Sequence, residues 1–267
     1  MSNFKHKKKF GQNFLTNQND VLAKIMEVSA VEEGDVVVEI GPGEGALTEL
    51  LLEKASKVYC FEIDRDLEPI LRKKYDRNEK FNLVMGDVLE ADLKEILKND
   101  NKVKVVANIP YYITSPIINK LIEHKDKVKE IYIMVQKEVA ERITSKSGKE
   151  RSVLTLAVEY YGDSEYLFTI PKEFFTPVPN VDSAFMSIKL YDEDYSKKIS
   201  EEVFFKYVKA AFSNKRKNIL NNLATLGYSK DELRVKMGIL GISENERAEN
   251  ITIDKFVEMA NLFEQKK

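Results

Sequence analysis

The spacing of apolar and polar residues predicts short strands that alternate with helices as far as about residue 190. Short apolar runs rich in Val and Ile are typical of buried strands in a parallel sheet, whereas apolar residues three and four positions apart predict helices. The predicted strands are 36–40, 57–61, 81–85, 103–107, 130–135, 166–170 and 184–190. The predicted helices are 18–30, 47–53, 65–75, one that starts at Thr114 or Ser115, 136–143 and 153–161.

From about residue 194 the pattern changes to helices without strands, predicted at 201–212, 216–226, 230–237 and 253–263. Alternating strands and helices indicate an α/β fold whose largely parallel sheet carries helices on both faces. The sequence therefore predicts two domains. We place the α/β domain at residues 1–193, with a basic arm at 1–19, and a small all-α domain at 194–267.

The first candidate site motif is Asn108-Ile109-Pro110-Tyr111, which comes directly after the predicted strand 103–107. Pro110 cannot continue a central strand, so the chain turns where Asn108 is presented, at the sheet edge where ligands of open α/β sheets bind. The Asn108 amide and the Pro110 carbonyl can both accept hydrogen bonds from an exocyclic amine, and Tyr111 offers a flat face to a planar base. These residues favour methylation of a nucleobase amino group. The alternative is an ordinary turn that ends a strand.

A second motif, the glycine-rich turn 41–45, joins the strand 36–40 to a helix. Gly41, Gly43 and Ala46 also satisfy the G-x-G-x-x-A form of a nicotinamide dinucleotide site. Glu39 argues against that class, because a carboxylate suits a cationic sulfonium ligand better than a pyrophosphate. Glu62 lies 21 residues after Gly41, where an acid accepts hydrogen bonds from ribose hydroxyls. Glu62 supports a ribose-bearing cofactor without distinguishing S-adenosylmethionine (SAM) from NAD.

Two further segments carry candidate site residues. Asp87 follows the predicted strand 81–85 and can accept a hydrogen bond from an adenine amino group. The loop 174–183 contains Phe175, Pro177 and Pro179 in an F-x-P-x-P pattern. This stiff loop could hold an aromatic ring against a substrate base, or it could be a hydrophobic plug.

Composition bounds the class of protein. With 267 residues, of which 43% are hydrophobic and 32% charged, the chain is typical of a soluble folded protein. It has no apolar run long enough to span a membrane, and its basic N-terminus lacks the apolar segment of a secretory signal. We therefore expect a cytoplasmic protein with no membrane partner. Cys60 is the one cysteine, which excludes an internal disulfide and a cysteine-based zinc cluster. We expect it to be inert core, and we expect no metal.

The distribution of charge says more than the net charge of −2. Residues 1–19 contain no acid and four lysines, Lys5, Lys7, Lys8 and Lys9. Residues 203–230 also contain no acid, and their basic residues are Lys206, Lys209, Lys215, Arg216, Lys217 and Lys230. Two such segments on a neutral-to-acidic body indicate a face that binds a polyanion. Two solvated surfaces are the alternative.

Taken in order, these motifs resemble those of the small-subunit ribosomal RNA adenine dimethyltransferases, the KsgA/RsmA family. The resemblance runs nearly end to end through KKKFGQNFL, VEIGPGEGALT, FEID, GDVL, NIPY, MVQKEVAERI, FFTPVPNVDSA, AFSNKRKNI and RAENI. It implies a Rossmann-like, SAM-dependent methyltransferase domain and a helical domain that docks onto rRNA. The implied reaction, part of ribosome biogenesis, is the dimethylation of N6 on two adjacent adenines near the 3′ end of 16S rRNA in the small subunit. A monomer is the default for a ribosome-docking enzyme.

The resemblance also implies roles for individual residues. In the cofactor site, Gly41 would lie beside the methionine part of SAM, Glu62 would bind its ribose and Asp87 would bind the amino group of its adenine. The full implied cofactor set is Asn13, Leu15, Gly41, Gly43, Glu62, Ile63, Asp87, Val88 and Asn108. The residues implied to surround the target base are Asn108, Pro110, Tyr111 and Phe175, and the base would lie between the rings of Tyr111 and Phe175. Together with the charge pattern, it implies RNA contacts from Lys7, Lys8, Lys9, Lys215, Arg216 and Lys217.

Three other classes of protein are weighed against this one. The related large-subunit rRNA methyltransferases of macrolide resistance would share NIPY and the glycine turn, but they differ in the segment that corresponds to 211–217. A non-catalytic RNA-binding or assembly factor is disfavoured because the site residues are intact, although both roles can coexist. An NAD-dependent oxidoreductase leaves NIPY and the basic segment unexplained.

Overall fold

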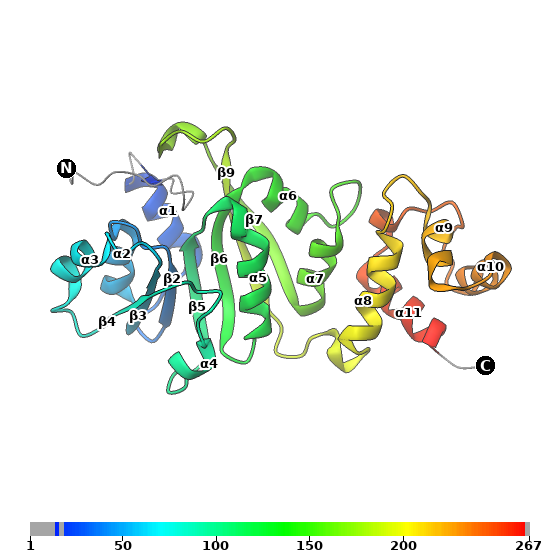
Figure 1. Ribbon diagram of the computed structural model, residues 1–267, viewed down its shortest axis with the longest axis horizontal. Helices are drawn as coiled ribbons and strands as arrows, with labels where there is room; N and C mark the ends of the chain where they lie inside the picture. The colour runs from blue at the N-terminus through cyan, green and yellow to red at the C-terminus, as the bar shows by residue number, and fades with distance from the viewer. Residues whose placement is uncertain (1–13, 16–18, 265–267) are drawn as a thin grey trace. The chain divides into compact units, whose positions relative to one another are not determined.

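The computed structural model describes residues 14–15 and 19–264, and its chain forms two compact units (Figure 1). The first unit contains the chain up to residue 140 together with 165–190. The second contains 141–164 and the chain from 191 onward. The sequence placed one boundary between 193 and 194. The structure has a break close to that point, after 190, and also groups residues 141–164 with the C-terminal helices.

The first unit is built on a seven-stranded sheet with the strand order β4-β3-β2-β5-β6-β9-β7. The pairs from β4 to β6 are parallel, and β9 runs antiparallel to β6. The strands are β2 (Val36–Ile40), β3 (Lys57–Glu62), β4 (Phe81–Met85), β5 (Val103–Asn108), β6 (Val128–Gln136), β7 (Gly162–Ile170) and β9 (Ser183–Leu190). The predicted α/β class is confirmed. The main difference is β7, which begins four residues earlier than the predicted strand 166–170.

Helices and one short strand pair complete this unit. The helices are α1 (Asn19–Ser29), α2 (Ala46–Lys54), α3 (Glu68–Tyr75), α4 (Leu93–Ile96), α5 (Thr114–Glu123) and the start of α6 (Lys137–Thr144). Helix α5 packs against β6, and α2 packs against β3. The short strands β1 (Phe14–Leu15) and β8 (Phe175–Thr176) pair antiparallel. No helix in the described part of the chain is long and apolar enough to cross a membrane.

Strand alternation determines which side chains share a face of the sheet. Val37, Cys60 and Val106 lie in one buried cluster together with residues of α1 and α2. Because successive side chains of a strand point to opposite faces, residues two positions apart return to the same face. Glu62 is two residues after Cys60, and Asn108 is two residues after Val106. The candidate cofactor acid and the candidate catalytic amide therefore lie on the same face, at the ends of their strands.

A buried ion pair fastens the opposite end of the sheet to α1. Lys104 Nζ lies 2.9 Å from Asp35 Oδ2 and donates to the carbonyls of Ser29, the last residue of α1, and Ala30, the residue after it. Lys129 donates to the other Asp35 oxygen at 2.8 Å. Burial by itself raises the pKa of Asp35, but the hydrogen bonds from Lys129, the Glu32 amide and Lys104 outweigh it and lower that pKa.

Asp35→Asn is expected to destabilise the protein at pH 7 by about 2 kcal/mol, because hydrogen bonds to charged groups contribute roughly that amount. The pKa of Asp35 is lower in the folded chain than its ordinary value of 3.8. Its contribution is therefore complete above pH 3.8 and is lost as the pH falls through the folded value. Urea unfolding at pH 7, 4 and 3 measures this, and the difference from wild type should shrink at the lowest pH. Glu33→Gln, an exposed carboxylate in the same turn, should stay within about 0.5 kcal/mol of wild type.

The second unit is helical and draws on two segments of the chain. Its elements are the end of α6, α7 (Val153–Tyr161), α8 (Glu201–Ala211), α9 (Ile219–Leu223), α10 (Lys230–Ile239) and α11 (Ile253–Glu264). Helix α7 packs against α8 and α11. The Tyr160 ring lies 4.8 Å from that of Phe204, centroid to centroid, and its hydroxyl donates to the Ile199 carbonyl at 2.7 Å. The predicted helix 216–226 is shorter, because Asn218 caps α9 and a 3₁₀ turn covers 224–226.

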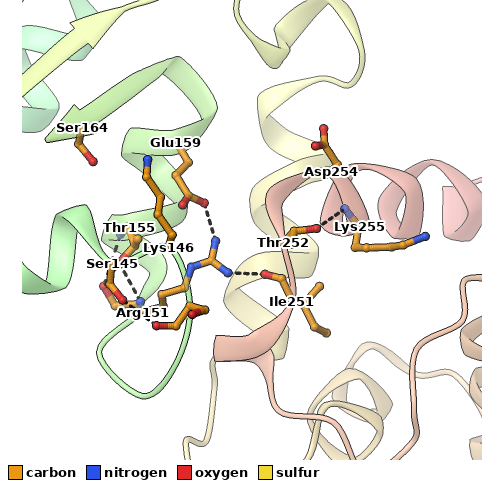
Figure 2. Close-up of polar contacts among 12 residues, drawn as sticks. Ser145, Lys146, Arg151, Thr155, Glu159, Ser164, Ile251, Thr252, Asp254 and Lys255 are labelled. Atoms are coloured by element: carbon orange, nitrogen blue, oxygen red, sulfur yellow. Dashed lines mark hydrogen bonds and ion pairs between the residues drawn. The ribbon is translucent and has the colours of Figure 1, made fainter.

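Arg151 connects the two segments of this unit (Figure 2). The side chain is 1% exposed; one terminal nitrogen donates to the Ile251 carbonyl and the other to the Glu159 carboxylate. The Arg151 Nε is buried and makes no hydrogen bond with the part of the chain that is described. Burial raises the pKa of Glu159, and Arg151 partly counteracts that rise. Residues before α7 and before α11 are thereby held together by one charged side chain.

Candidate functional site

The candidate site lies at the carboxyl ends of four adjacent parallel strands. In the sheet order β4-β3-β2-β5, strand β2 has β3 on one side and β5 on the other, so the order of the strands reverses there. Ligands of open α/β sheets bind outside the carboxyl ends of the strands at such a reversal. Glu62 ends β3, Asn108 ends β5, and Gly41 and Asp87 follow β2 and β4. All these candidate residues belong to the first unit.

The glycine turn brings the ends of β2 and β5 close together. Gly41 has φ +72°, and a Cβ at this position would lie 3.4 Å from the Asn108 backbone oxygen. Gly41 N donates to the Phe61 carbonyl at 2.9 Å, which also fixes the turn to β3. Gly43, with φ +60°, donates its amide to Glu62 Oε2 at 3.2 Å. Glycine at 41 and 43 lets the backbone of the turn approach the neighbouring strands and any ligand above them.

Glu62 is the acceptor at the centre of this edge. It is 4% exposed and accepts hydrogen bonds from the amides of Gly43 and, at 2.8 Å, Asp64. Burial raises its pKa, and these two hydrogen bonds oppose the rise. A carboxylate accepts about four hydrogen bonds, so Glu62 retains capacity for the hydroxyls of a ribose. Next to it, Ile63 is 44% exposed, which leaves an apolar side chain open at the edge.

The loop after β4 is tied to Glu62 and presents Asp87. Gly86 N donates to the Glu62 carbonyl at 2.9 Å. Asp87 is partly buried and accepts from the Leu89 amide at 2.9 Å through Oδ1, while Val88 is buried. One oxygen of Asp87 thus orients the side chain, and the carboxylate keeps capacity to accept from an amine.

The Asn-Ile-Pro-Tyr segment turns as the sequence predicts. Ile109 is buried and anchors the segment, Pro110 has φ −60° and ψ 136°, and a 3₁₀ turn follows at Tyr111–Ile113. The Pro110 carbonyl accepts from the Ile113 amide at 3.2 Å, which uses one of its two lone pairs. Asn108 is partly exposed at the end of β5. The amide of Asn108 and the carbonyl of Pro110 are therefore presented from a fixed turn.

Ser183, which the sequence analysis did not single out, holds the Tyr111 ring. The two hydroxyl oxygens lie 2.6 Å apart, and Ser183 is 0% exposed. Burial raises the pKa of Tyr111 above its usual value and outweighs the Ser183 hydrogen bond, which acts to lower it, so the phenol is neutral at pH 7. The signal in the sequence was Asp182-Ser183 at the end of the F-x-P-x-P loop, where a small polar residue begins a buried strand.

Phe175 is buried and does not present an open surface on which a base could stack. It is 1% exposed, belongs to the buried cluster with Phe168 and Phe185, and pairs with Leu15 across β8 and β1. Its role as a stacking partner of a target base stays a prediction, and it requires the ring to become accessible. Leu15 is likewise buried, beside Phe175. The other predicted N-terminal site residues, Asn13, Lys7, Lys8 and Lys9, lie outside the described residues.

Glu39, which the sequence analysis treated as a carboxylate next to the ligand, is buried in the structure. It is 2% exposed and accepts from Thr48 Oγ1 at 2.6 Å and from the Cys60 thiol at 3.4 Å. Burial raises its pKa to about 7, so near neutral pH it is only partly ionised. Its weight as an argument against a pyrophosphate is correspondingly smaller. Cys60 is buried, as predicted, and burial also raises the pKa of its thiol.

The second unit displays the predicted basic residues on one exposed loop between α8 and α9. Lys215, Arg216 and Lys217 are all exposed. Asn222, 2% exposed, donates to the carbonyls of Ala211 at 2.6 Å and Asn214 at 3.1 Å, and so fixes the loop from below. The sequence analysis missed Asn222; an asparagine on the apolar side of a short helix was the available signal. Within residues 14–15 and 19–264, no group of His, Cys, Asp and Glu is arranged to hold a metal ion.

Comparisons with known proteins agree on one family. A family model described as ribosomal RNA adenine dimethylase matches residues 3–265. The ribosomal RNA small subunit methyltransferase A of Fusobacterium nucleatum is 66% identical over 262 residues, which is 98% of each chain. Among solved structures, a dimethyladenosine transferase from Plasmodium falciparum is 27% identical with a TM-score of 0.76, over 92% of this chain and 95% of that one. The 23S rRNA methyltransferase ErmE is 25% identical with the same TM-score, over 94% of this chain and all of the other.

Proposed function

The chain belongs to the ribosomal RNA adenine dimethylase family, and from this premise we propose that it is a SAM-dependent rRNA (adenine-N6,N6)-dimethyltransferase. Its proposed substrate is a pair of adjacent adenines near the 3′ end of 16S rRNA in the small ribosomal subunit. The backbone fold alone does not decide the class of rRNA substrate, because the dimethyladenosine transferase from Plasmodium falciparum and the 23S rRNA methyltransferase ErmE both have a TM-score of 0.76. The 66% identity to a small-subunit methyltransferase favours the small subunit.

The residues at the sheet edge fit SAM. Glu62 has acceptor capacity for the ribose hydroxyls, Asp87 can accept from the adenine amine, and exposed Ile63 offers apolar surface to the adenine ring. The Gly41 turn lets the ligand approach the backbone next to Asn108. When bound, SAM supplies an electrophilic methyl group on a positively charged sulfur. The observation that carries the proposal is that this acceptor set and the NIPY turn converge at one edge.

Asn108, Pro110 and Tyr111 would orient the target. The adenine must leave its stack to reach the site, which costs a few kcal/mol, and stacking on Tyr111 can recover part of that cost. The N6 lone pair is delocalised into the ring, so N6 is a weak nucleophile. Hydrogen bonds from the amino group to Asn108 Oδ1 and the Pro110 carbonyl would turn that lone pair toward the methyl group. At each transfer N6 would bond the methyl carbon as that carbon leaves the sulfur of SAM, and N6 would release one proton to water. Adenine N6 begins with two N–H bonds, so the monomethylated amine keeps one and a second transfer remains possible.

The exposed basic loop would supply phosphate contacts. Lys215, Arg216 and Lys217 are exposed, and Asn222 holds the backbone that precedes them through the Ala211 and Asn214 carbonyls. RNA binding therefore does not have to order a flexible segment first. Each phosphate contact releases counterions, so binding weakens as salt concentration rises. We infer that this loop contributes affinity that does not depend on sequence.

Replacing Lys215, Arg216 and Lys217 together by Ala should reduce the slope of log Kobs against log salt concentration by about 2 to 3. Filter binding of the small subunit at several salt concentrations measures this slope. A matched variant replaces Lys94 and Lys98, exposed lysines that pair with acids in the first unit, and should keep the wild-type slope. An unchanged slope in the triple variant would exclude the loop from the RNA contact.

Methyl transfer from labelled SAM tests the function directly. The acceptors are small subunits from cells that lack this enzyme, with large subunits as the control, and the products are nucleosides resolved by mass. Dimethyladenosine on the small subunit alone is the expected result. Label on large-subunit RNA would instead assign the protein to the class of ErmE. Tight binding to small subunits without label would identify a non-catalytic assembly factor.

A further inference from the structure

Exposed apolar side chains gather at the edge that carries the candidate site. Seven large hydrophobic residues of the described chain are exposed, and four of them are Ile63, Tyr112, Val178 and Val181. Ile63 follows β3, and Tyr112 follows β5. Val178 and Val181 precede β9, whose first residue, Ser183, lies opposite Gln136, the last residue of the parallel strand β6. All four therefore lie at the carboxyl edge of the parallel strands. The segment before β9 extends beyond this end of the sheet in Figure 1.

Tyr112 stands out among them because it is a large ring on a rigid turn. It is 63% exposed, whereas its neighbour Tyr111 is half-buried and bonded to Ser183. The turn is fixed by the bond from the Ile113 amide to the Pro110 carbonyl and by Thr114 Oγ1, which donates to the Tyr111 carbonyl at 3.1 Å. Consecutive residues of such a turn point in different directions, so one ring is held against the core while the other faces solvent. Packing does not account for the exposed ring.

We propose that Tyr112 stacks on the base of the nucleotide adjacent to the target adenine, with Val178 and Val181 lining the side of that position. This inference rests on the proposed function and deepens it. RNA that places a base beside Tyr111 must pass the next residue of the same turn, and an adjacent nucleotide is the part of the substrate that lies there. Aromatic side chains are the usual platforms for unpaired bases. Val178 and Val181 are exposed at the same edge of the sheet and carry no charge.

Stacking differs from phosphate binding in its dependence on salt. A neutral ring releases no counterions, so the loss of Tyr112 should weaken RNA binding equally at all salt concentrations. Loss of the basic residues 215–217 should instead weaken RNA binding most at low salt concentration, where phosphate contacts contribute most. The two contributions can therefore be separated in one set of titrations.

The test compares Tyr112→Ala, Tyr112→Phe and Tyr112→Leu with wild type. Tyr191→Ala is the matched control, since Tyr191 is an exposed tyrosine directly after β9, beyond the end that is remote from Ser183. Tyr112→Ala should raise the KM for small subunits by about 5- to 150-fold. Its kcat, salt slope and SAM affinity should stay within about twofold of wild type. Tyr112→Phe should restore the KM, because the hydroxyl is not required, and Tyr112→Leu should not, because it lacks a flat face.

A spectroscopic probe distinguishes failure of this inference from failure of the proposed function. A single-stranded RNA with 2-aminopurine next to the target adenine should lose fluorescence when wild type binds, because the probe stacks on Tyr112. Tyr112→Ala should bind without this loss. Quenching that is the same in both proteins would overturn the inference, as would a KM in Tyr112→Ala equal to wild type. Quenching that requires Tyr112, in a protein that transfers no methyl group, would uphold the stacking contact and reject the proposed function.

Discussion

Replacing Asn108 by alanine is expected to lower kcat for methyl transfer by about 10²- to 10³-fold. That is the usual cost of removing one hydrogen bond that stabilises a transition state in a preorganised site. The backbone oxygen of Asn108, which lies beside Gly41, is unchanged by the substitution. The variant should therefore fold normally. Single-turnover transfer with labelled SAM measures the chemical step, and SAM titration measures binding separately.

The matched control is Asn82→Ala, in strand β4. Asn82 donates to the Lys80 carbonyl and has no place in the proposed site. Its kcat should stay within about twofold of wild type. If Asn108→Ala also transferred methyl groups at the wild-type rate, the proposed role of its amide in orienting N6 would be wrong.

Arg151→Met is expected to destabilise the helical unit by about 3–5 kcal/mol, the usual cost of removing one partner of a buried ion pair. Glu159 would keep its buried carboxylate without the guanidinium, and the Ile251 carbonyl would lose its donor. Urea unfolding, followed by circular dichroism and by hydrogen exchange of α7 and α11, measures the change. Protection of both helices should fall together.

Two further variants test whether the loss of stability arises because the ion pair is buried. The double variant Arg151→Met/Glu159→Leu should recover much of the loss, because an apolar replacement of the whole pair leaves no buried charge. Lys146→Met should cost less than about 1 kcal/mol, because Lys146 and Asp163 form an ion pair in which both side chains are more than 60% exposed. Equal losses in Arg151→Met and Lys146→Met would show that burial does not determine the contribution of Arg151.

The edge of the sheet that holds the site could be predicted because each strand there is a separate apolar run. Strand β2 was predicted with its observed bounds, and β3 and β5 are each one residue longer than predicted. Once those runs are assigned to one parallel sheet, their carboxyl ends must lie together. Gly41, Glu62, Asp87 and Asn108 converge for that reason.

Residues whose placement depends on distant packing could not be predicted in this way. For Phe175 the sequence left two alternatives open, a ring held against a base and a hydrophobic plug. In the structure Phe175 is buried in one cluster with Phe168 and Phe185 from other strands. Glu39 was expected to lie next to the ligand because it closely precedes a glycine turn, but it is buried and bonded to Thr48 on α2 and Cys60 on β3. No local pattern reports such contacts.

Helix α7 shows the same limit at the level of a whole element. It follows β6 in the chain and precedes β7, so alternation alone assigns it to the sheet domain. Its apolar residues instead pack against α8 and α11, some fifty to a hundred residues later in the sequence.

This arrangement has a consequence for the order in which the chain is made. Helix α7 leaves the translating ribosome well before α8 and α11, so Tyr160 has no Phe204 to pack against when it first emerges. Arg151 likewise waits for Ile251, one hundred residues downstream. Loop closure over that length must precede the contacts that reward it. The second unit can therefore complete its core only after residue 251 and helix α11 have been made. A nascent chain that stopped before residue 251 would leave the apolar side chains of α7 and the charge of Arg151 without these partners.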